Sequence, residues 1–220
     1  LVSRLLVRRE MPVILAVSLV VSALALRGVF DLWAGLALLI ALPILLYRLM
    51  KDEASVSDEV EIHDYSLGMG LALTIGGLLV LLASSNALVW GATAIALELG
   101  VSELVIGLTI VAIGTSLPEL ASSVASALKG KTDMALGTVI GSNLFNFLGV
   151  IGIAAVIHPF AVDPEVYIRD LPWTVGLTLL LWLISRFATQ GTISRRYGSL
   201  FLLLYVGYLV HIAATIVPIS

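Results

Sequence analysis

The chain has 220 residues, of which 60% are hydrophobic and only 12% are charged, and its mean hydropathy is +1.09. Because a soluble domain carries about 25% charged residues, these values exclude an ordinary soluble domain and a disordered chain, and they are typical of a protein in a lipid bilayer. The net charge of −3 comes without a basic patch, which argues against nucleic acid as a partner, and the absence of cysteine excludes disulfides and thiolate sites.

Seven apolar runs follow one another along the chain, and most of them are long enough, with their flanks, to cross a bilayer as a helix. A spanning helix needs roughly 17–25 mostly apolar residues. The runs cover residues 11–26, 32–49, 67–99, 101–128, 134–160, 171–187 and 197–218. The third run is long for one upright span and short for a pair, so it forms either one tilted helix or two short helices broken at Ser84-Ser85-Asn86.

The basic residues distinguish these two interpretations, because cytoplasmic loops collect Lys and Arg. If residues 67–99 are one span, 10 of the 12 basic residues share a side, whereas two spans would divide them 6 and 6. We therefore expect one tilted helix and an extracytoplasmic C-terminus. Only Arg27 and Arg169 then face outward, and the cytoplasmic side holds Arg4, Arg8, Arg9, Arg48, Lys51, Lys129, Lys131, Arg186, Arg195 and Arg196.

The longest polar stretch, residues 51–65, falls on the cytoplasmic side. Its acidic residues are Asp52, Glu53, Asp58, Glu59, Glu61 and Asp64. We interpret the stretch as a solvated acidic linker, with a cation-attracting or regulatory loop as the alternative. The ligand alternation and central glycine of an EF-hand are missing from it.

The fourth run contains the sequence GTSLPE, and its Glu119 is the only carboxylate well inside any of the seven runs. A charge at the bilayer centre costs roughly 2.5 to more than 10 kcal/mol, so it persists where it faces a cavity, a partner or an ion. The spacing i, i+3, i+4, i+7 places four residues on one helix face: Ala112, Thr115, Ser116 and Glu119.

The same segment also fits a capping box at Ser116-x-x-Glu119, with Pro118 in the first turn of a new helix and Gly114 breaking the span. The two interpretations are compatible. A helix broken in mid-membrane exposes backbone groups that are tolerated only where they line a cavity. Transporters hold ions at such half-helix ends.

In the fifth run, Ser142 and Asn146 are i, i+4 neighbours on one face. Gly137 and Gly141 form a GxxxG pattern, for which close helix packing is the favoured interpretation. Hydroxyl, amide and carboxylate oxygens together suit hard cations such as Na⁺ and Ca²⁺. The fourth and fifth runs therefore contain candidate cation ligands.

GTSLPEL followed by GTVIGSNLFN resembles the second alpha-repeat of the calcium/cation antiporter superfamily, within it the sodium/calcium exchanger family. The resemblance implies an all-α integral membrane protein, the C-terminal part of a ten-helix exchanger built from two inverted five-helix repeats, with broken helices at the ion site. Seven of the ten helices would lie in this chain. Residues 1–50 would be the last two helices of the first repeat, residues 51–65 the acidic cytoplasmic loop, and residues 66–220 the second repeat.

The resemblance also implies a set of cation ligands: Glu119, the side chains of Thr115 and Ser116, the carbonyl of Ala112, and Ser142 with Asn146. Some family members carry Asp at this position. Asn146 is neutral, so it lowers the negative charge of the site in this chain. The chain has no first alpha-repeat with its own glutamate, and calcium takes about 6–8 oxygen ligands. We therefore expect a missing N-terminal half and a chain that begins inside a longer exchanger. The 10 to 2 charge bias opposes a homodimer of oppositely inserted copies.

The resemblance thus implies antiport of Ca²⁺ against Na⁺ by alternating access, with no cofactor beyond the transported ions, and we expect a prokaryotic inner (plasma) membrane location. Ca²⁺/H⁺ or other cation antiport, a cation channel and a non-transporting membrane protein are the alternatives. An intramembrane enzyme with Ser116 as nucleophile would need a base, and no spacing supports His211 in that role, so we predict that the chain is not an enzyme.

Overall fold

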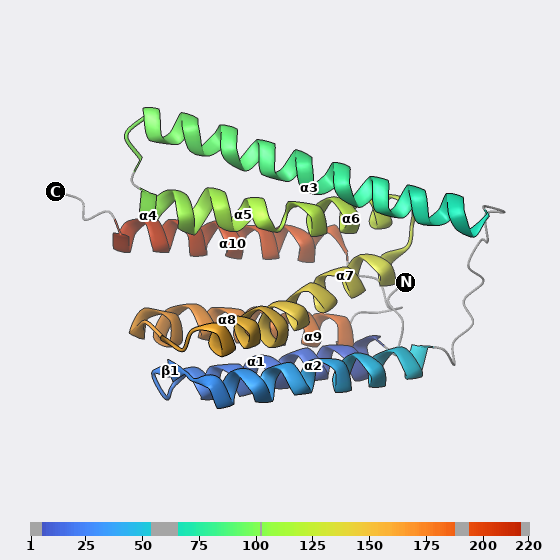
Figure 1. Cartoon of the computed structure of the whole chain (residues 1–220), viewed down its shortest axis with the longest axis horizontal. Helices are drawn as coiled ribbons and strands as arrows, with labels where there is room; N and C mark the ends of the chain where they lie inside the picture. The colour runs from blue at the N-terminus through green and yellow to red at the C-terminus, as the bar shows by residue number, and fades with distance from the viewer. Residues whose placement is uncertain (1–5, 54–65, 102, 188–193, 217–220) are drawn as a thin grey trace. The chain divides into compact units, whose positions relative to one another are not determined.

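The computed structural model describes residues 6–53, 66–101, 103–187 and 194–216. Within these ranges the chain is helical apart from turns and one short two-stranded ribbon (Figure 1). The chain divides into two compact units, which are described separately. The first combines Leu1–Asp58 with Ser126–Gly198, and the second combines Glu59–Ala125 with Ser199–Ser220.

The first unit is built from two stretches of chain that are separated in the sequence. Two π-helical turns continue directly into longer helices, and a third lies in the middle of a helix. In chain order the elements are η1 (Leu6–Glu10), α1 (Met11–Ala25), β1 (Val29–Phe30), α2 (Leu32–Glu53), α7 (Thr132–Phe145), η3 (Asn146–Val150), α8 (Ile151–Ile157), β2 (Phe160–Ala161), η4 (Val166–Asp170) and α9 (Leu171–Phe187).

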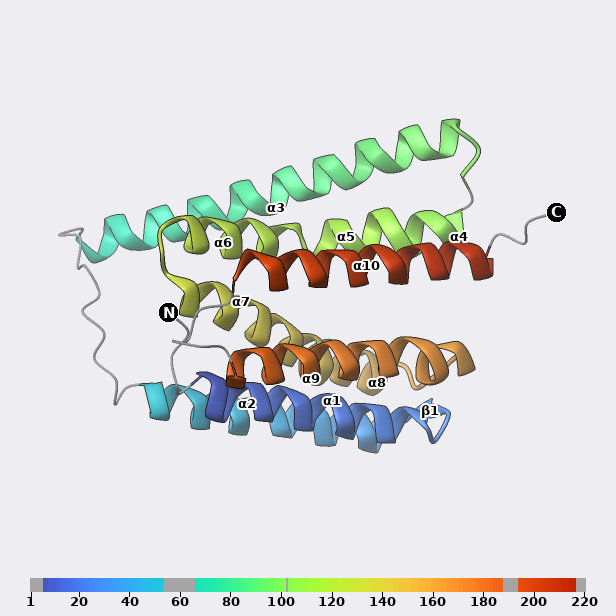
Figure 2. The same ribbon diagram turned by 180° about the vertical axis from the view of Figure 1, so that it is seen from behind.

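Helix α1 is the centre of the first unit. It packs against α7 and α9, and α2 packs against η3 and α8 (Figures 1 and 2). Met11 and Val21 of α1 are each 1% exposed and share one apolar core with Leu144 of α7. The indole Nε1 of Trp182 in α9 donates a hydrogen bond to the carbonyl of Val7 at 3.0 Å, which fixes η1 against α9.

Helices α2 and α8 touch backbone to backbone at Gly35 and Gly152. A Cβ atom placed on Gly35 would lie 2.8 Å from the carbonyl oxygen of Gly152, and one on Gly152 would lie 2.9 Å from Cγ of Leu39. Small residues at helix contacts allow this approach in membranes, where close packing replaces the hydrophobic effect as the force between helices. Apolar periodicity does not predict this glycine pair, because Gly35 and Gly152 lie far apart in the sequence.

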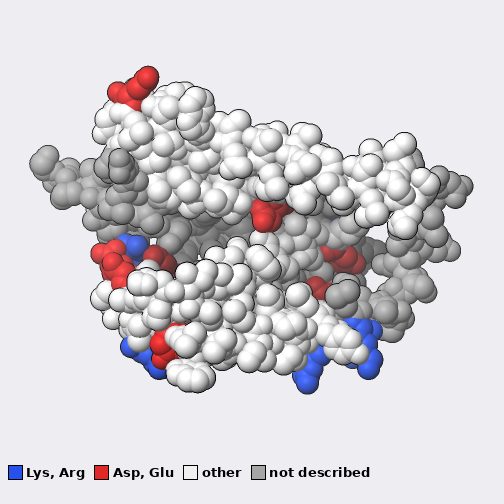
Figure 3. Space-filling view, in the orientation of Figure 1, with Lys and Arg blue, Asp and Glu red and all other residues white. Residues whose placement is uncertain are grey.

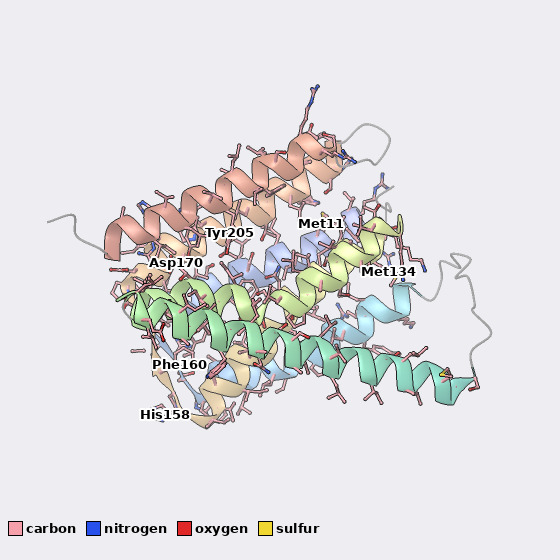
Figure 4. All side chains as sticks on the ribbon, turned by 90° about the horizontal axis from the view of Figure 1, so that it is seen from above. Met11, Met134, His158, Phe160, Asp170 and Tyr205 are labelled. Atoms are coloured by element: carbon pink, nitrogen blue, oxygen red, sulfur yellow. The ribbon has the colours of Figure 1, made fainter. Side chains whose placement is uncertain are left out.

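The ribbon joins the α1–α2 corner to the α8–α9 connection. Val29 pairs with Ala161 and Phe30 with Phe160 in antiparallel register, and the two phenylalanine rings are 5.5 Å apart. Figure 4 places His158 and Phe160 toward one end of this unit and Met11 toward the other.

Helix α8 ends at Ile157, so the expected run 134–160 extends three residues beyond the helix. His158 leaves the helix with φ −149° and ψ 107°, because the residue before a proline avoids the helical region.

The second unit contains one long helix beside a broken one. Its elements are α3 (Leu67–Glu98), α4 (Glu103–Ile106), η2 (Gly107–Val111), α5 (Ala112–Thr115) and most of α6 (Leu117–Leu128) and α10 (Arg195–Ile216). Helix α3 packs against α4, η2 and α5. The expectation of one helix for the third run is confirmed: α3 has 32 residues, roughly 48 Å at 1.5 Å per residue.

The serines at the centre of α3 do not break it. Ser84 donates its hydroxyl to the carbonyl of Val80 at 2.7 Å, so the polar side chain is satisfied inside the helix. At the start of α3, the hydroxyl of Ser66 accepts a hydrogen bond from the amide of Met69 at 3.3 Å and caps the helix.

Among the described residues, four helices are long and apolar enough to cross a membrane: Leu32–Leu49, Leu67–Glu98, Thr132–Ile157 and Val166–Phe187. The bent pair Thr109–Thr115 and Leu117–Leu128 makes a fifth when counted as one span. The first and last predicted runs also form helices, α1 with 15 residues and α10 with 22. In the space-filling view, Lys and Arg gather toward the two sides of the picture, and most of the surface between them is uncharged (Figure 3).

The start of the predicted acidic linker is helical, since Lys51, Asp52 and Glu53 complete the last turn of α2. The rest of that prediction, residues 54–65, lies outside the described residues.

Candidate cation site

The broken helix changes direction at Ser116. The segment Thr109–Thr115 and the segment Leu117–Leu128 meet at 50°. Ser116 has φ −95° and ψ 2°, in the sparsely populated bridge region between helix and strand. Its amide donates to the carbonyl of Ile113 and its carbonyl accepts from the amide of Leu120, both at 3.0 Å, so the residue closes α5 and opens α6.

The break lies two residues after the predicted one, because Gly114 keeps its helical place inside α5. Pro118 follows at the second position of α6, where a missing N–H leaves no helical acceptor unsatisfied. Proline and the bridge conformation of Ser116, rather than glycine, therefore end the first half-helix.

Three candidate ligand oxygens converge at the end of α5. The hydroxyl of Thr115 donates to the carbonyl of Ala112 at 3.1 Å, and the hydroxyl of Ser116 lies 3.5 Å from the same carbonyl oxygen. The Ser116 amide turns to Ile113 and Gly114, so Ala112 receives these hydroxyl hydrogen bonds instead of the usual i+4 amide bond. The hydroxyl of Ser116 thus points back toward α5 and does not take the forward position of a capping box.

Glu119 lies in the first turn of α6, and its Oε2 atom is buried. The carboxylate is therefore near the positive end of the α6 helix dipole, which favours negative charge. It also follows Ser116 by one turn. Ala112, Thr115, Ser116 and Glu119 thus lie close together along the second unit, but the 50° bend at Ser116 interrupts the single helix face that the spacing predicts.

Ser142 and Asn146 belong to the first unit. They are one turn apart, at the end of α7 and the start of η3. Leu144 and Leu148, on the opposite side of the helix, are buried in the core of that unit, so Ser142 and Asn146 lie on the side away from it, and Asn146 is exposed. The structure therefore places the six candidate residues in two groups, one in each unit.

A π-helical turn adjoins each group, and neither turn is predicted by the sequence pattern. η2 ends at Val111, directly before Ala112, and η3 begins at Asn146. Such turns widen a helix by one residue and are frequent at functional sites. No apolar periodicity marks either turn, because the surrounding segments are apolar on nearly every side and carry no stripe whose phase an inserted residue could shift.

The charged pairs outside the site lie at the ends of helices in the first unit. Asp31 accepts from the amide of Ala34 at 2.8 Å and pairs with Arg27 at 3.0 Å. The Ala34 amide first, and then the Arg27 charge, hold the pKa of Asp31 below its ordinary 3.8. Arg169 pairs with Glu165 at 2.9 Å and with Asp170 at 2.6 Å. Across the described ranges, no three His, Asp or Glu side chains gather into a metal-binding group.

Comparison with known proteins places this geometry in a family. The sodium/calcium exchanger protein family matches residues 69–214. The putative antiporter CaxA of Alkalimonas amylolytica is 49% identical over 133 residues, which cover 60% of this chain and 42% of that protein. The sodium/calcium exchanger MaX1 of Methanosarcina acetivorans is 46% identical over 94 residues, 43% of this chain and 27% of that protein.

A solved structure shows the same likeness in three dimensions. The sodium-calcium exchanger NCX_Mj, soaked with 2.5 mM Na⁺ and 10 mM Sr²⁺, superposes with a TM-score of 0.79 and 33% identity over 96% of this chain and 67% of that one. The matched regions span less than half the length of the two curated relatives. With its membrane-spanning helices and this match over most of its length, the chain is an integral membrane protein that belongs to the sodium/calcium exchanger family.

Proposed function

We propose that this chain supplies the C-terminal half of an antiporter that moves Ca²⁺ against Na⁺ across a prokaryotic inner membrane. The observation that carries the proposal is the bend at Ser116, where a backbone carbonyl, two hydroxyls and one carboxylate occupy a single break in an apolar helix. The names of the relatives NCX_Mj and MaX1 as sodium/calcium exchangers support this choice of ions.

The proposed ligands are all oxygens, which hard cations prefer. Ala112 offers its carbonyl, Thr115 and Ser116 their hydroxyls, and Glu119 its carboxylate; Ser142 and Asn146 complete the half-site. Calcium takes about 6–8 oxygen ligands and depends on carboxylate charge. One carboxylate leaves a divalent ion incompletely neutralised, so we propose that the preceding repeat supplies a second one.

The proposed topology has seven crossings, with the C-terminus outside. Residues 1–50 are then the last two helices of the first repeat, residues 51–65 the acidic cytoplasmic loop, and residues 66–220 the second, inverted repeat. Broken helices at the interface of two repeats suit alternating access, in which one group of helices rocks against another around a fixed site. No cofactor is needed, because the transported ions are the whole of the chemistry.

The test compares two proteins in lipid vesicles: this chain alone, and the same chain preceded by a first repeat. With an outward Na⁺ gradient, the extended protein should take up ⁴⁵Ca²⁺, and the chain alone should match empty liposomes. Uptake that follows a pH gradient and ignores Na⁺ would favour a Ca²⁺/H⁺ antiporter. Uptake that needs neither gradient would identify a channel and overturn the proposal.

A further inference from the structure

The side chain of Val89 in α3 packs directly over Gly114 in α5. A Cβ atom placed on Gly114 would overlap Cγ2 of Val89 and would lie 3.3 Å from its Cβ. Gly114 is buried, whereas its neighbour Thr115 is exposed. A side chain at Gly114 therefore does not fit unless Val89 or the helix backbone moves.

This contact lies on the opposite side of α5 from Ala112 and Ser116, two of the candidate ligands. In a helix, two residues are separated by roughly 200° and four residues by roughly 40°. Gly114 therefore faces away from Ala112, while Ser116 returns to nearly the same side as Ala112. Val89 thus packs against the ligand-bearing turn on the side away from Ala112 and Ser116.

The turn needs external support because it is short. α5 has four residues, Ala112–Thr115, between the π-helical turn η2 and the pivot at Ser116. So short a helix has little stability of its own and takes its direction from tertiary packing. α3, in contrast, is an unbroken helix of 32 residues, and a β-branched valine in a helix is held in essentially one χ1 rotamer.

Hydrogen bonding does not fix this part of the contact between α3 and the broken helix. Thr93, one turn along α3 from Val89, buries its Oγ1 atom without a hydrogen-bond partner. At these two positions the packing of α3 against α5 therefore depends on shape, and the fit of Val89 over Gly114 is part of that shape.

We propose that Val89 is a positioning residue for cation binding. By filling the space over Gly114, it holds the turn in which the Ala112 carbonyl and the hydroxyls of Thr115 and Ser116 face one side. This inference rests on the proposed antiport function. It assigns the need for glycine at position 114 to the contact with α3 and not to backbone flexibility.

The test is a size-exchange experiment in the exchanger completed by its first repeat. Gly114→Ala should lower Na⁺-dependent ⁴⁵Ca²⁺ flux by about tenfold or more, because overpacking forces the turn aside. Adding Val89→Ala to the same protein should restore most of the flux. Gly107→Ala is the matched control, since nothing lies within 4 Å of its added Cβ, and it should resemble wild type.

The single substitution at position 89 separates positioning from general stability. Val89→Ala should raise the KM for Ca²⁺ several-fold with little change in kcat. Val80→Ala, at a position 66% exposed on the same helix, should change neither constant. Wild-type flux in Gly114→Ala, or a double variant as inactive as Gly114→Ala, would overturn the proposal.

A readout without transport distinguishes this inference from the antiport function. In detergent, Gly114→Ala should lower the unfolding temperature of the 220-residue chain, and Val89→Ala in the same chain should raise it again. If wild type shows no Na⁺-dependent flux but this recovery occurs, the proposed function fails and the packing contact stands. If the recovery is absent while wild type transports, the role of Val89 fails and the antiport function stands.

Discussion

Glu119 is the residue on which the proposed site depends most. It combines a buried carboxylate oxygen with the first turn of a half-helix inside an apolar segment. The sequence identifies it without any structure, because a carboxylate in mid-membrane is costly and is retained for a purpose. The sequence does not reveal that Ser116, and not Gly114, is the pivot, because that choice depends on the backbone angles of one residue.

At this scale we predict the effect of Glu119→Gln in the completed exchanger. The substitution keeps size and hydrogen bonding but removes the charge that offsets a desolvated Ca²⁺ ion, so ⁴⁵Ca²⁺ flux should fall by orders of magnitude. Membrane insertion should survive, because a neutral side chain is less costly in lipid. Glu98→Gln is the control, since Glu98 is an exposed residue at the end of α3. Near-normal flux in Glu119→Gln would reduce the residue to a helix cap.

At the scale of elements, apolar runs predict the helices well and their interruptions poorly. The 32-residue helix α3 follows from the distribution of basic residues, and the broken fourth run follows from GTSLPE. The ribbon of Phe30 and Phe160 was missed, because two apolar residues at the end of an apolar run carry no strand signal. The Gly35–Gly152 contact was missed because it joins helices distant in the sequence.

The crossing of α2 and α8 gives a prediction about stability. Gly35→Val should destabilise the chain by about 1–3 kcal/mol, because the added side chain meets the backbone of α8 and overpacks the contact. The measurement is thermal unfolding in detergent. Gly137→Ala, in a GxxxG pattern but with nothing within 4 Å of an added Cβ, should unfold close to wild type. An equally stable Gly35→Val would show that the two helices do not meet as described.

At the scale of the whole molecule, the charge bias predicts which loops lie on the same side of the membrane. This prediction depends on α3, because a single span places the two ends of that helix on opposite sides. Leu67 and Leu99, at its two ends, are 82% and 77% exposed. Single cysteines there should react with a membrane-impermeant maleimide from opposite sides of intact cells, because one helix separates them. Labelling of both from the same side would contradict the single span and reverse the proposed position of the C-terminus.

The first unit draws on chain segments from both sides of residues 54–65: α1 and α2 precede them, and α7 to α9 follow. The ribbon and the Gly35–Gly152 crossing join these segments by contact and not by continuity of the chain. A protease that nicks the polypeptide within residues 54–65 would therefore leave two fragments that purify together. The same two fragments, translated from separate messages, could reassemble as complementary parts.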